Sequence, residues 1–173
     1  MVTRTCFTAH RPRRERGFTL SELMVVLALM AIVMGFAIPG LRDLLGGQKV
    51  KSAAFDLVSS VMYARSEAGK RSASISLKAA SGNDLASGWC VVFGTAASCS
   101  VTAPAAETMR VHQPYPTVSF TWKTTAGPIV FGQTGRITSL VSIEVADLSN
   151  AAFKRCITID VTGVPTSRSG ACS

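Results

Sequence analysis

Hydrophobic residues are concentrated in one uninterrupted run near the start of the chain. Residues 23–41 contain no charged side chain, and Glu22 lies immediately before them. A helix that spans a membrane needs about 20 apolar residues. We therefore expect a single transmembrane helix over residues 18–40. The arginine-rich segment 1–17 is then a leader that the positive-inside bias holds on the cytoplasmic side.

A secretory signal peptide is the alternative interpretation of this run. Gly35-Phe36-Ala37 offers the pattern of small residues found at signal-peptidase sites. The length of the apolar stretch and the position of Glu22 at its mouth favour an anchor instead.

A second helical pattern follows Pro39 and Gly40. Proline lacks a backbone donor and clashes with the preceding turn, so we expect a kink or a locally melted segment at Pro39. Residues 41–71 then return to a helical period and predict an amphipathic helix. Its expected buried stripe consists of Ala54, Leu57, Val58, Val61 and Met62.

The remainder of the chain, residues 72–173, has a pattern typical of β-strands. Short runs of β-branched and aromatic residues alternate with turn formers. We expect strands at residues 73–78, 88–94, 109–111, 118–122, 129–131, 141–145 and 156–161. Polar and apolar residues alternate in the last two runs, which predicts an antiparallel sheet with one packed face. The fold class is therefore α+β, with the helix packed on a sheet.

The net charge of +8 overstates how basic the folded part is. Segment 1–17 carries five arginines and one glutamate, a net charge of +4, so removing it leaves +4 on the rest of the chain. The high isoelectric point alone therefore does not indicate nucleic-acid binding.

Four cysteines lie in the β-rich part, namely Cys90, Cys99, Cys156 and Cys172, and Cys6 lies in the leader. Four cysteines in a small exported domain suggest two disulfides, for which three connectivities exist. We favour Cys90–Cys99 and Cys156–Cys172, the pairs that close the shortest loops. A zinc site is the alternative, but the paired C-x2-C spacing of such sites is missing.

The sequence shows no pattern typical of an enzyme. Motifs such as G-x-S-x-G and H-E-x-x-H are missing, and acidic residues are scarce. The one histidine outside the leader, His112, lies near Pro114 and Pro116, where we expect a surface loop residue. We therefore predict no catalytic residue, no metal site and no cofactor.

The stretch Gly17-Phe18-Thr19-Leu20-Ser21-Glu22 resembles the class III signal of type IV prepilins. The resemblance implies cleavage between Gly17 and Phe18 by a prepilin peptidase, followed by methylation of the Phe18 amino group. It also implies a helix break near Pro39 and a bacterial inner-membrane protein with its carboxyl-terminal head in the periplasm. A carboxylate at the edge of hydrocarbon is costly unless it is paired. We therefore expect Glu22 to pair with the amino group of Phe18 on a neighbouring subunit and to act in filament assembly.

Three stretches of the β-rich part resemble the GspH/FimT group of minor pilins: Gly88-Trp89-Cys90-Val91-Val92-Phe93, Ile129-Val130-Phe131-Gly132-Gln133-Thr134-Gly135-Arg136 and Cys156-Ile157-Thr158-Ile159-Asp160-Val161-Thr162-Gly163. The resemblance implies a type IV pilin fold, in which a long kinked helix packs on an antiparallel head. The implied function is a structural subunit of a type II secretion pseudopilus or a type IV pilus, which contributes to filament initiation, assembly and protein secretion. The implied partners are the prepilin peptidase, other pilins and inner-membrane lipid.

DNA binding during natural transformation is the alternative function. Some pilins of this group carry a G-R-x-R element near the carboxyl end, where arginines contact phosphate. Here Gly163-Val164-Pro165-Thr166 has neither arginine, and Gly135-Arg136-Ile137-Thr138 lacks the second. Arg136 and Arg168 are the candidates for a weak DNA contact, and nucleic acid is not the favoured partner.

Overall fold

The computed structural model describes residues 17–95 and 98–172, with the side chains of residues 37–43 outside that description. The leader up to residue 16, with Cys6, also lies outside the described residues. The chain divides into two compact units, Met1–Gly40 and Leu41–Ser173. One helix, α1 (Leu20–Arg71), belongs partly to each unit.

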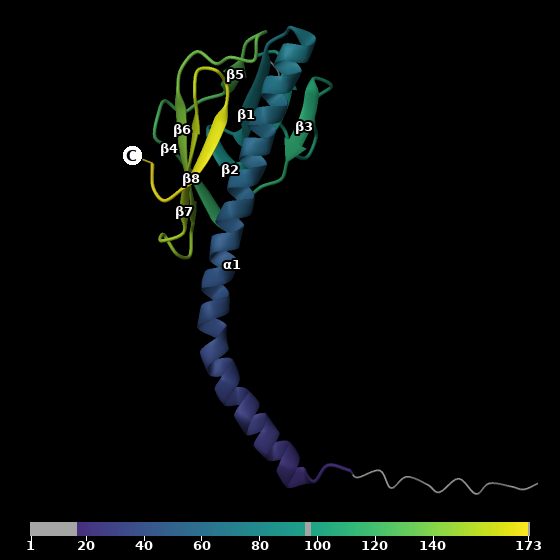
Figure 1. Ribbon diagram of the computed structural model, residues 1–173. Helices are drawn as coiled ribbons and strands as arrows, with labels where there is room; N and C mark the ends of the chain where they lie inside the picture. The colour runs from purple at the N-terminus through teal and green to yellow at the C-terminus, as the bar shows by residue number, and fades with distance from the viewer. Residues whose placement is uncertain (1–16, 96–97, 173) are drawn as a thin grey trace, which may run out of the picture. The chain divides into compact units, whose positions relative to one another are not determined.

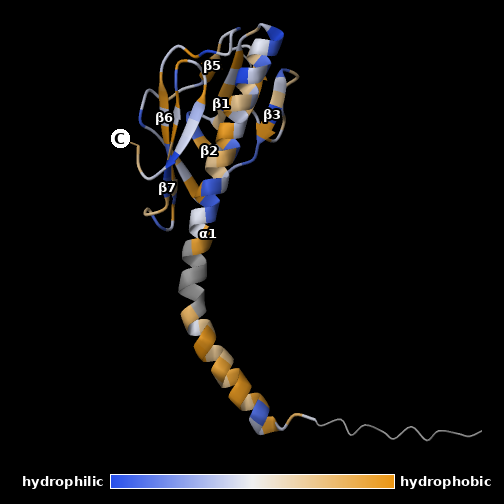
Figure 2. Ribbon diagram, in the orientation of Figure 1, coloured by the Kyte–Doolittle hydropathy of each residue, from blue (hydrophilic) through white to orange (hydrophobic). Residues whose placement is uncertain are grey.

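The part of α1 in the first unit begins at a side-chain cap. The backbone N–H of Glu22 donates to Thr19 Oγ1 at 3.2 Å, and Thr and Glu three residues apart are the usual pair at such a cap. Residues 23–36 are all apolar and exposed around the whole circumference of the helix (Figure 2). A helix that is apolar on every side needs an apolar environment around it.

In the described part of the chain, no helix has the length and the apolar content needed to cross a membrane. The transmembrane span that we expect over residues 18–40 therefore stays a prediction.

Helix α1 continues through Pro39 without a gap, so it contains no melted segment there. A proline removes a single backbone hydrogen bond of the helix, and a long helix can lose one without ending. The side chain of Pro39 lies outside the described residues, and a kink at this position stays a prediction.

The second unit buries one face of α1. This face consists of Val50, Ala53, Ala54, Leu57, Ser60, Val61, Ala64 and Ala68. It includes three residues of the expected stripe, and Val58 packs at its edge. The expectation for Met62 is wrong, since its side chain is 56% exposed. Ala64 occupies the next position of the face instead, one turn after Ser60 and Val61.

Within the described residues, eight strands form two antiparallel sheets where we expected one. The first sheet has the order β3-β2-β1-β5, and its strands are β1 (Ile75–Ser81), β2 (Asp84–Phe93), β3 (Thr108–His112) and β5 (Ile129–Phe131). The second has the order β4-β6-β7-β8, and its strands are β4 (Val118–Trp122), β6 (Val141–Asp147), β7 (Lys154–Ile159) and β8 (Pro165–Ser169). Every strand except β8 overlaps a predicted run. β8 is polar and almost wholly exposed, so it has no apolar alternation that could reveal it.

In the second unit, α1 runs alongside the strands (Figure 1), and the buried side chains of the described residues form a hydrophobic core that joins the helix to both sheets. Trp89 of β2 is almost fully buried in it, and its indole N–H donates to Ser60 Oγ on α1 at 3.0 Å. Ser60 in turn donates to the backbone oxygen of Asp56 at 2.8 Å. Both polar groups that the core encloses at this point are therefore hydrogen-bonded, as buried polar groups require.

His112 is part of this packing, so the expectation that it is a surface loop residue is wrong. It ends β3, and its ring stacks on Trp89 with 4.2 Å between the ring centroids. Its Nε2 lies 3.4 Å from Asp56 Oδ2, and the hydroxyl of Tyr115 donates to the same oxygen. A flat ring with polar edges can cover the indole while both nitrogens face polar partners.

Two glycine turns meet on Arg65 of α1. Gly135 and Gly163 have φ values of 73° and 78°, in the left-handed region that favours glycine. A Cβ added to Gly163 would lie 2.2 Å from the carbonyl oxygen of Gly135, and one added to Gly135 would lie 3.0 Å from Arg65 Cγ. Arg65 Nε donates to the carbonyl oxygen of Thr162 at 3.0 Å. The glycines therefore allow the ends of the two sheets to close over the helix.

We predict that Gly163→Ala destabilises the protein by about 2–4 kcal/mol, because it adds a backbone clash to the cost of the left-handed conformation. Gly170→Ala is the matched control: its φ is 100°, and a Cβ there meets nothing within 4 Å. It should cost only about 1–2 kcal/mol. Urea unfolding of the full chain in detergent measures both values, and equal losses would contradict the clash.

Candidate assembly site and the charged surface of the head

The residues of the expected cleavage site lie just before α1. Gly17, Phe18 and Thr19 are outside the helix, and the Phe18 side chain is 83% exposed. A Cβ at Gly17 would meet nothing within 4 Å. The Gly17–Phe18 bond therefore lies in a non-helical, accessible segment, the conformation that a protease needs in order to bind it.

The backbone of Glu22 takes part in the cap at the start of α1, which its sequence motif alone did not show. Its backbone N–H completes the cap at Thr19, and a negative charge in the first turn also favours the positive end of the helix dipole. Its carboxylate is exposed and forms no ion pair with any described residue. The local cap therefore accounts for the backbone of Glu22 and leaves its carboxylate available to a partner.

Glu144 of the second sheet forms two ion pairs and accepts one backbone hydrogen bond. Its carboxylate lies 3.5 Å from Lys123 Nζ and 3.6 Å from Lys154 Nζ, and it accepts the backbone N–H of Cys172 at 3.2 Å. Burial opposes the charged form, but the N–H of Cys172 and the two ammonium groups outweigh it. The pKa of the Glu144 carboxyl is therefore held below its ordinary value.

The two candidate DNA contacts are not brought together in one cavity. Arg168 lies on β8 opposite Cys156 and lines a surface cavity of about 450 Å³ with Lys123. Arg136 is exposed in the loop after β5, beside Gly135, and does not line that cavity.

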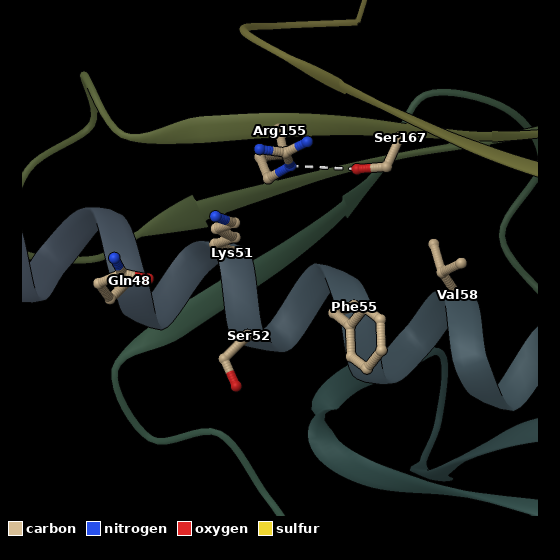
Figure 3. Close-up of a pocket in the computed structure, with 7 residues that line it drawn as sticks. All are labelled: Gln48, Lys51, Ser52, Phe55, Val58, Arg155 and Ser167. Atoms are coloured by element: carbon tan, nitrogen blue, oxygen red, sulfur yellow. Dashed lines mark hydrogen bonds between the residues drawn. The ribbon is translucent and has the colours of Figure 1, made fainter.

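A groove between α1 and the β7–β8 hairpin was not predicted from the sequence. It has a volume of about 380 Å³, and its lining includes Lys51, Phe55 and Val58 of α1 with Arg155 and Ser167 of the hairpin (Figure 3). The sequence pattern of the helix treats Lys51 and Phe55 as ordinary exposed positions. Arg155 becomes part of the groove only through the pairing of β7 with β8.

The structure contains the two disulfides that loop length favours, Cys90–Cys99 and Cys156–Cys172, with Cα atoms 5.5 and 4.9 Å apart. These bonds use all four cysteines of the proposed alternative zinc site. In the described residues, no group of three or more His, Cys, Asp or Glu side chains is placed to hold a metal ion.

Comparison with known proteins agrees with the resemblance to pilins seen in the sequence. The family model of type II transport protein GspH matches residues 53–163, and the prokaryotic N-terminal methylation motif matches residues 12–38. No curated protein matches the sequence.

Two crystal structures of the type IV minor pilin FimU from Pseudomonas aeruginosa strain PAO1, in space groups P21 and P65, are similar in fold. The first has a TM-score of 0.58 at 24% identity and covers 70% of this chain and 89% of its own. The second has a TM-score of 0.56 at 24% identity, with 68% and 91% covered.

The α+β fold, with a long helix on antiparallel sheets, is thus that of a type IV pilin. Because the family model covers more than half of the sequence, the chain belongs to the GspH family of minor pilins and pseudopilins. Proteins of this family are structural subunits of a pilus or pseudopilus, and the resemblance seen in the sequence is confirmed.

The low pKa of Glu144 predicts acid-sensitive stability. A carboxyl whose folded pKa is depressed stabilises the fold above its unfolded pKa and loses that contribution as the pH falls through the folded pKa. Glu144→Gln should therefore lower the melting temperature by about 3–6 °C at pH 7. The difference from wild type should shrink as the pH falls below about 4.

The matched control for this prediction is Glu107→Gln, which removes an exposed carboxylate that forms no ion pair with the described residues. It should leave the melting temperature nearly unchanged at both pH values. A Glu144→Gln difference that is the same at pH 3 and pH 7 would show that the charge of Glu144 does not stabilise the fold.

Proposed function

We propose that this chain is a minor subunit of an inner-membrane-anchored filament, a type II secretion pseudopilus or a type IV pilus. A prepilin peptidase cleaves it between Gly17 and Phe18, and the new amino group of Phe18 is methylated. Residues 18–40 then hold the chain in the membrane lipid, with the head in the periplasm. In the filament, the Glu22 carboxylate pairs with the amino group of Phe18 on a neighbouring pilin and sets the register between the helices.

The observation that carries this proposal is an exposed, wholly apolar stretch of α1, residues 23–36, with an unpaired carboxylate at its start, at Glu22. An apolar helix needs lipid or other apolar helices around it, and a carboxylate there needs a cationic partner. Neighbouring subunits with the same arrangement would satisfy both needs. The role in protein secretion or piliation, and in filament initiation, rests on membership of the family and on this arrangement.

DNA uptake is the less favoured candidate. It would require arginines that act together on phosphates, and Arg136 and Arg168 do not line a common cavity. The structure also shows that Gly135 and Gly163, the glycines beside which a G-R-x-R element was sought, make close backbone contacts. Their conformation therefore has a structural reason that does not involve DNA.

Processing is the first test. Gly17→Leu places a bulky side chain beside the scissile bond, and we expect the full-length chain with its basic leader to accumulate in the membrane. Intact-mass spectrometry distinguishes this precursor from a mature chain that begins with methylated Phe18. The control is Glu22→Ala, which should still be cleaved. Normal maturation of the Gly17→Leu variant would contradict the assigned cleavage site.

Assembly is the second test, and it uses two substitutions of Glu22. Glutamine keeps the length and polarity of the glutamate side chain but carries no charge, whereas alanine removes both. The backbone N–H that donates to Thr19 Oγ1 is present in either variant. If the charge pairs with a neighbouring subunit, both variants should copurify with the filament about tenfold less than wild type, because the amino group of Phe18 is left unpaired. Secretion or piliation should fall in parallel.

A different result would show that assembly needs a polar side chain at this position and not its charge. In that case Glu22→Gln would copurify like wild type and only Glu22→Ala would be impaired. If both variants assembled and supported secretion or piliation normally, the proposed register contact would be wrong. Deleting the whole chain shows which process depends on it, secretion in a pseudopilus or piliation in a pilus.

A further inference from the structure

The groove between α1 and the β7–β8 hairpin exposes a large aromatic side chain that the core does not use. Phe55 is 70% exposed, whereas its helical neighbours Ala54 and Leu57 are buried. Val58, one turn further along, is half-buried at the same edge. Both side chains line the groove, and an exposed apolar surface beside polar groups is typical of a protein contact site.

The groove also holds positive charge that no carboxylate of the described residues balances. Arg155 donates to Ser167 Oγ at 3.1 Å and to Ser169 Oγ at 3.4 Å, both of which are neutral hydroxyls. Lys51 points from α1 toward the strand that carries Arg155 (Figure 3). Neither cation forms an ion pair with a described residue.

Lys154, the residue before Arg155, does have a carboxylate partner, because it lies on the other face of the strand. Successive residues of a strand point to opposite faces, so Lys154 and Arg155 lie on different sides of β7. Lys154 faces outward and pairs with Glu144, whereas Arg155 lies on the side of the buried Ile157. The outer face therefore contains one carboxylate that pairs with its two lysines, whereas none lines the groove on the inner face.

We propose that this groove docks a segment of a neighbouring filament subunit, in which an apolar side chain lies beside a carboxylate. The apolar side chain would pack on Phe55 and Val58, and the carboxylate would accept hydrogen bonds from Arg155 and Lys51. Aromatic and arginine side chains are the usual anchors of protein interfaces, and opposite charges select the partner. This inference rests on the proposed function, because it places the chain among other subunits.

Charge favours a different subunit over a second copy of this chain. The unit from residue 41 to residue 173 carries thirteen Lys and Arg side chains against eight Asp and Glu. Two such units repel each other, and an acidic partner does not. The docked segment therefore belongs to another, more acidic pilin of the same filament.

Photo-crosslinking in the living bacterium tests this contact. The full chain carries benzoylphenylalanine in place of Phe55, and the matched control carries it in place of Leu148, which is 65% exposed and does not line the groove. We expect a crosslink at position 55 and none at position 148. Mass spectrometry of the linked peptide should identify another pilin-like subunit, with Asp or Glu within a few residues of the linked position.

Charge reversal supplies the second measurement. The double substitution Lys51→Glu and Arg155→Glu should reduce the crosslink about tenfold, since it turns attraction into repulsion. Lys49→Glu changes charge on the same helix but outside the groove, so it should leave the crosslink intact. Replacing the partner's carboxylate by lysine should restore the crosslink to the doubly reversed chain, which a folding defect would not allow.

Several outcomes would overturn the proposal: a crosslink to a second copy, a crosslink to DNA, equal crosslinking at positions 55 and 148, or no crosslink at position 55. Copurification of the same chain with the filament separates this failure from a failure of the proposed function. A chain that copurifies but does not crosslink through position 55 refutes only the groove. A chain that does not copurify with any filament refutes the proposed function itself.

Discussion

The structure of the head depends on how closely α1 approaches the two sheets. Ala53, Ala54, Ala64 and Ala68 form much of its buried face, and side chains this small let a helix approach a sheet closely. At the far end, the two glycine turns close over Arg65, where any side chain at Gly163 would collide with backbone. The buried Trp89–Ser60 hydrogen bond exists only because helix and sheet are this near.

The parts of this fold that were predicted from the sequence are those with a regular apolar period. Leu57 and Val61 mark the buried face of the helix, and the alternation around Ile143 and Ile157 marks two central strands of the second sheet. β8 lacks such a period, because an edge strand exposed to solvent has no face to bury. The division of the strands into two sheets is a matter of long-range pairing, which local pattern does not encode.

The candidate sites show the same contrast between short-range and long-range patterns in the sequence. Glu22 and Gly17 could be proposed from the sequence because they lie within a few residues of each other in one motif. The groove at Phe55 and Arg155 was missed because its walls are 100 residues apart in sequence. His112 was misplaced for a related reason: nearby prolines suggested a loop, whereas its ring lies at the end of β3 and stacks on the buried Trp89 at the edge of the core.

The two charged surfaces of the head differ in how their charges are balanced, and this difference bears on function. On the outer face, Glu144 forms ion pairs with two lysines and also holds the backbone of Cys172 beside the second disulfide, so this carboxylate serves the fold. In the groove, Arg155 has only hydroxyl partners among the described residues, although a carboxylate would bind it more strongly. The negative charge of the Glu22 carboxylate likewise has no ion-pair partner among the described residues. We propose that partner subunits pair with the charges that the fold leaves unpaired at these two places, so that assembly gains the interaction energy that folding of the single chain does not use.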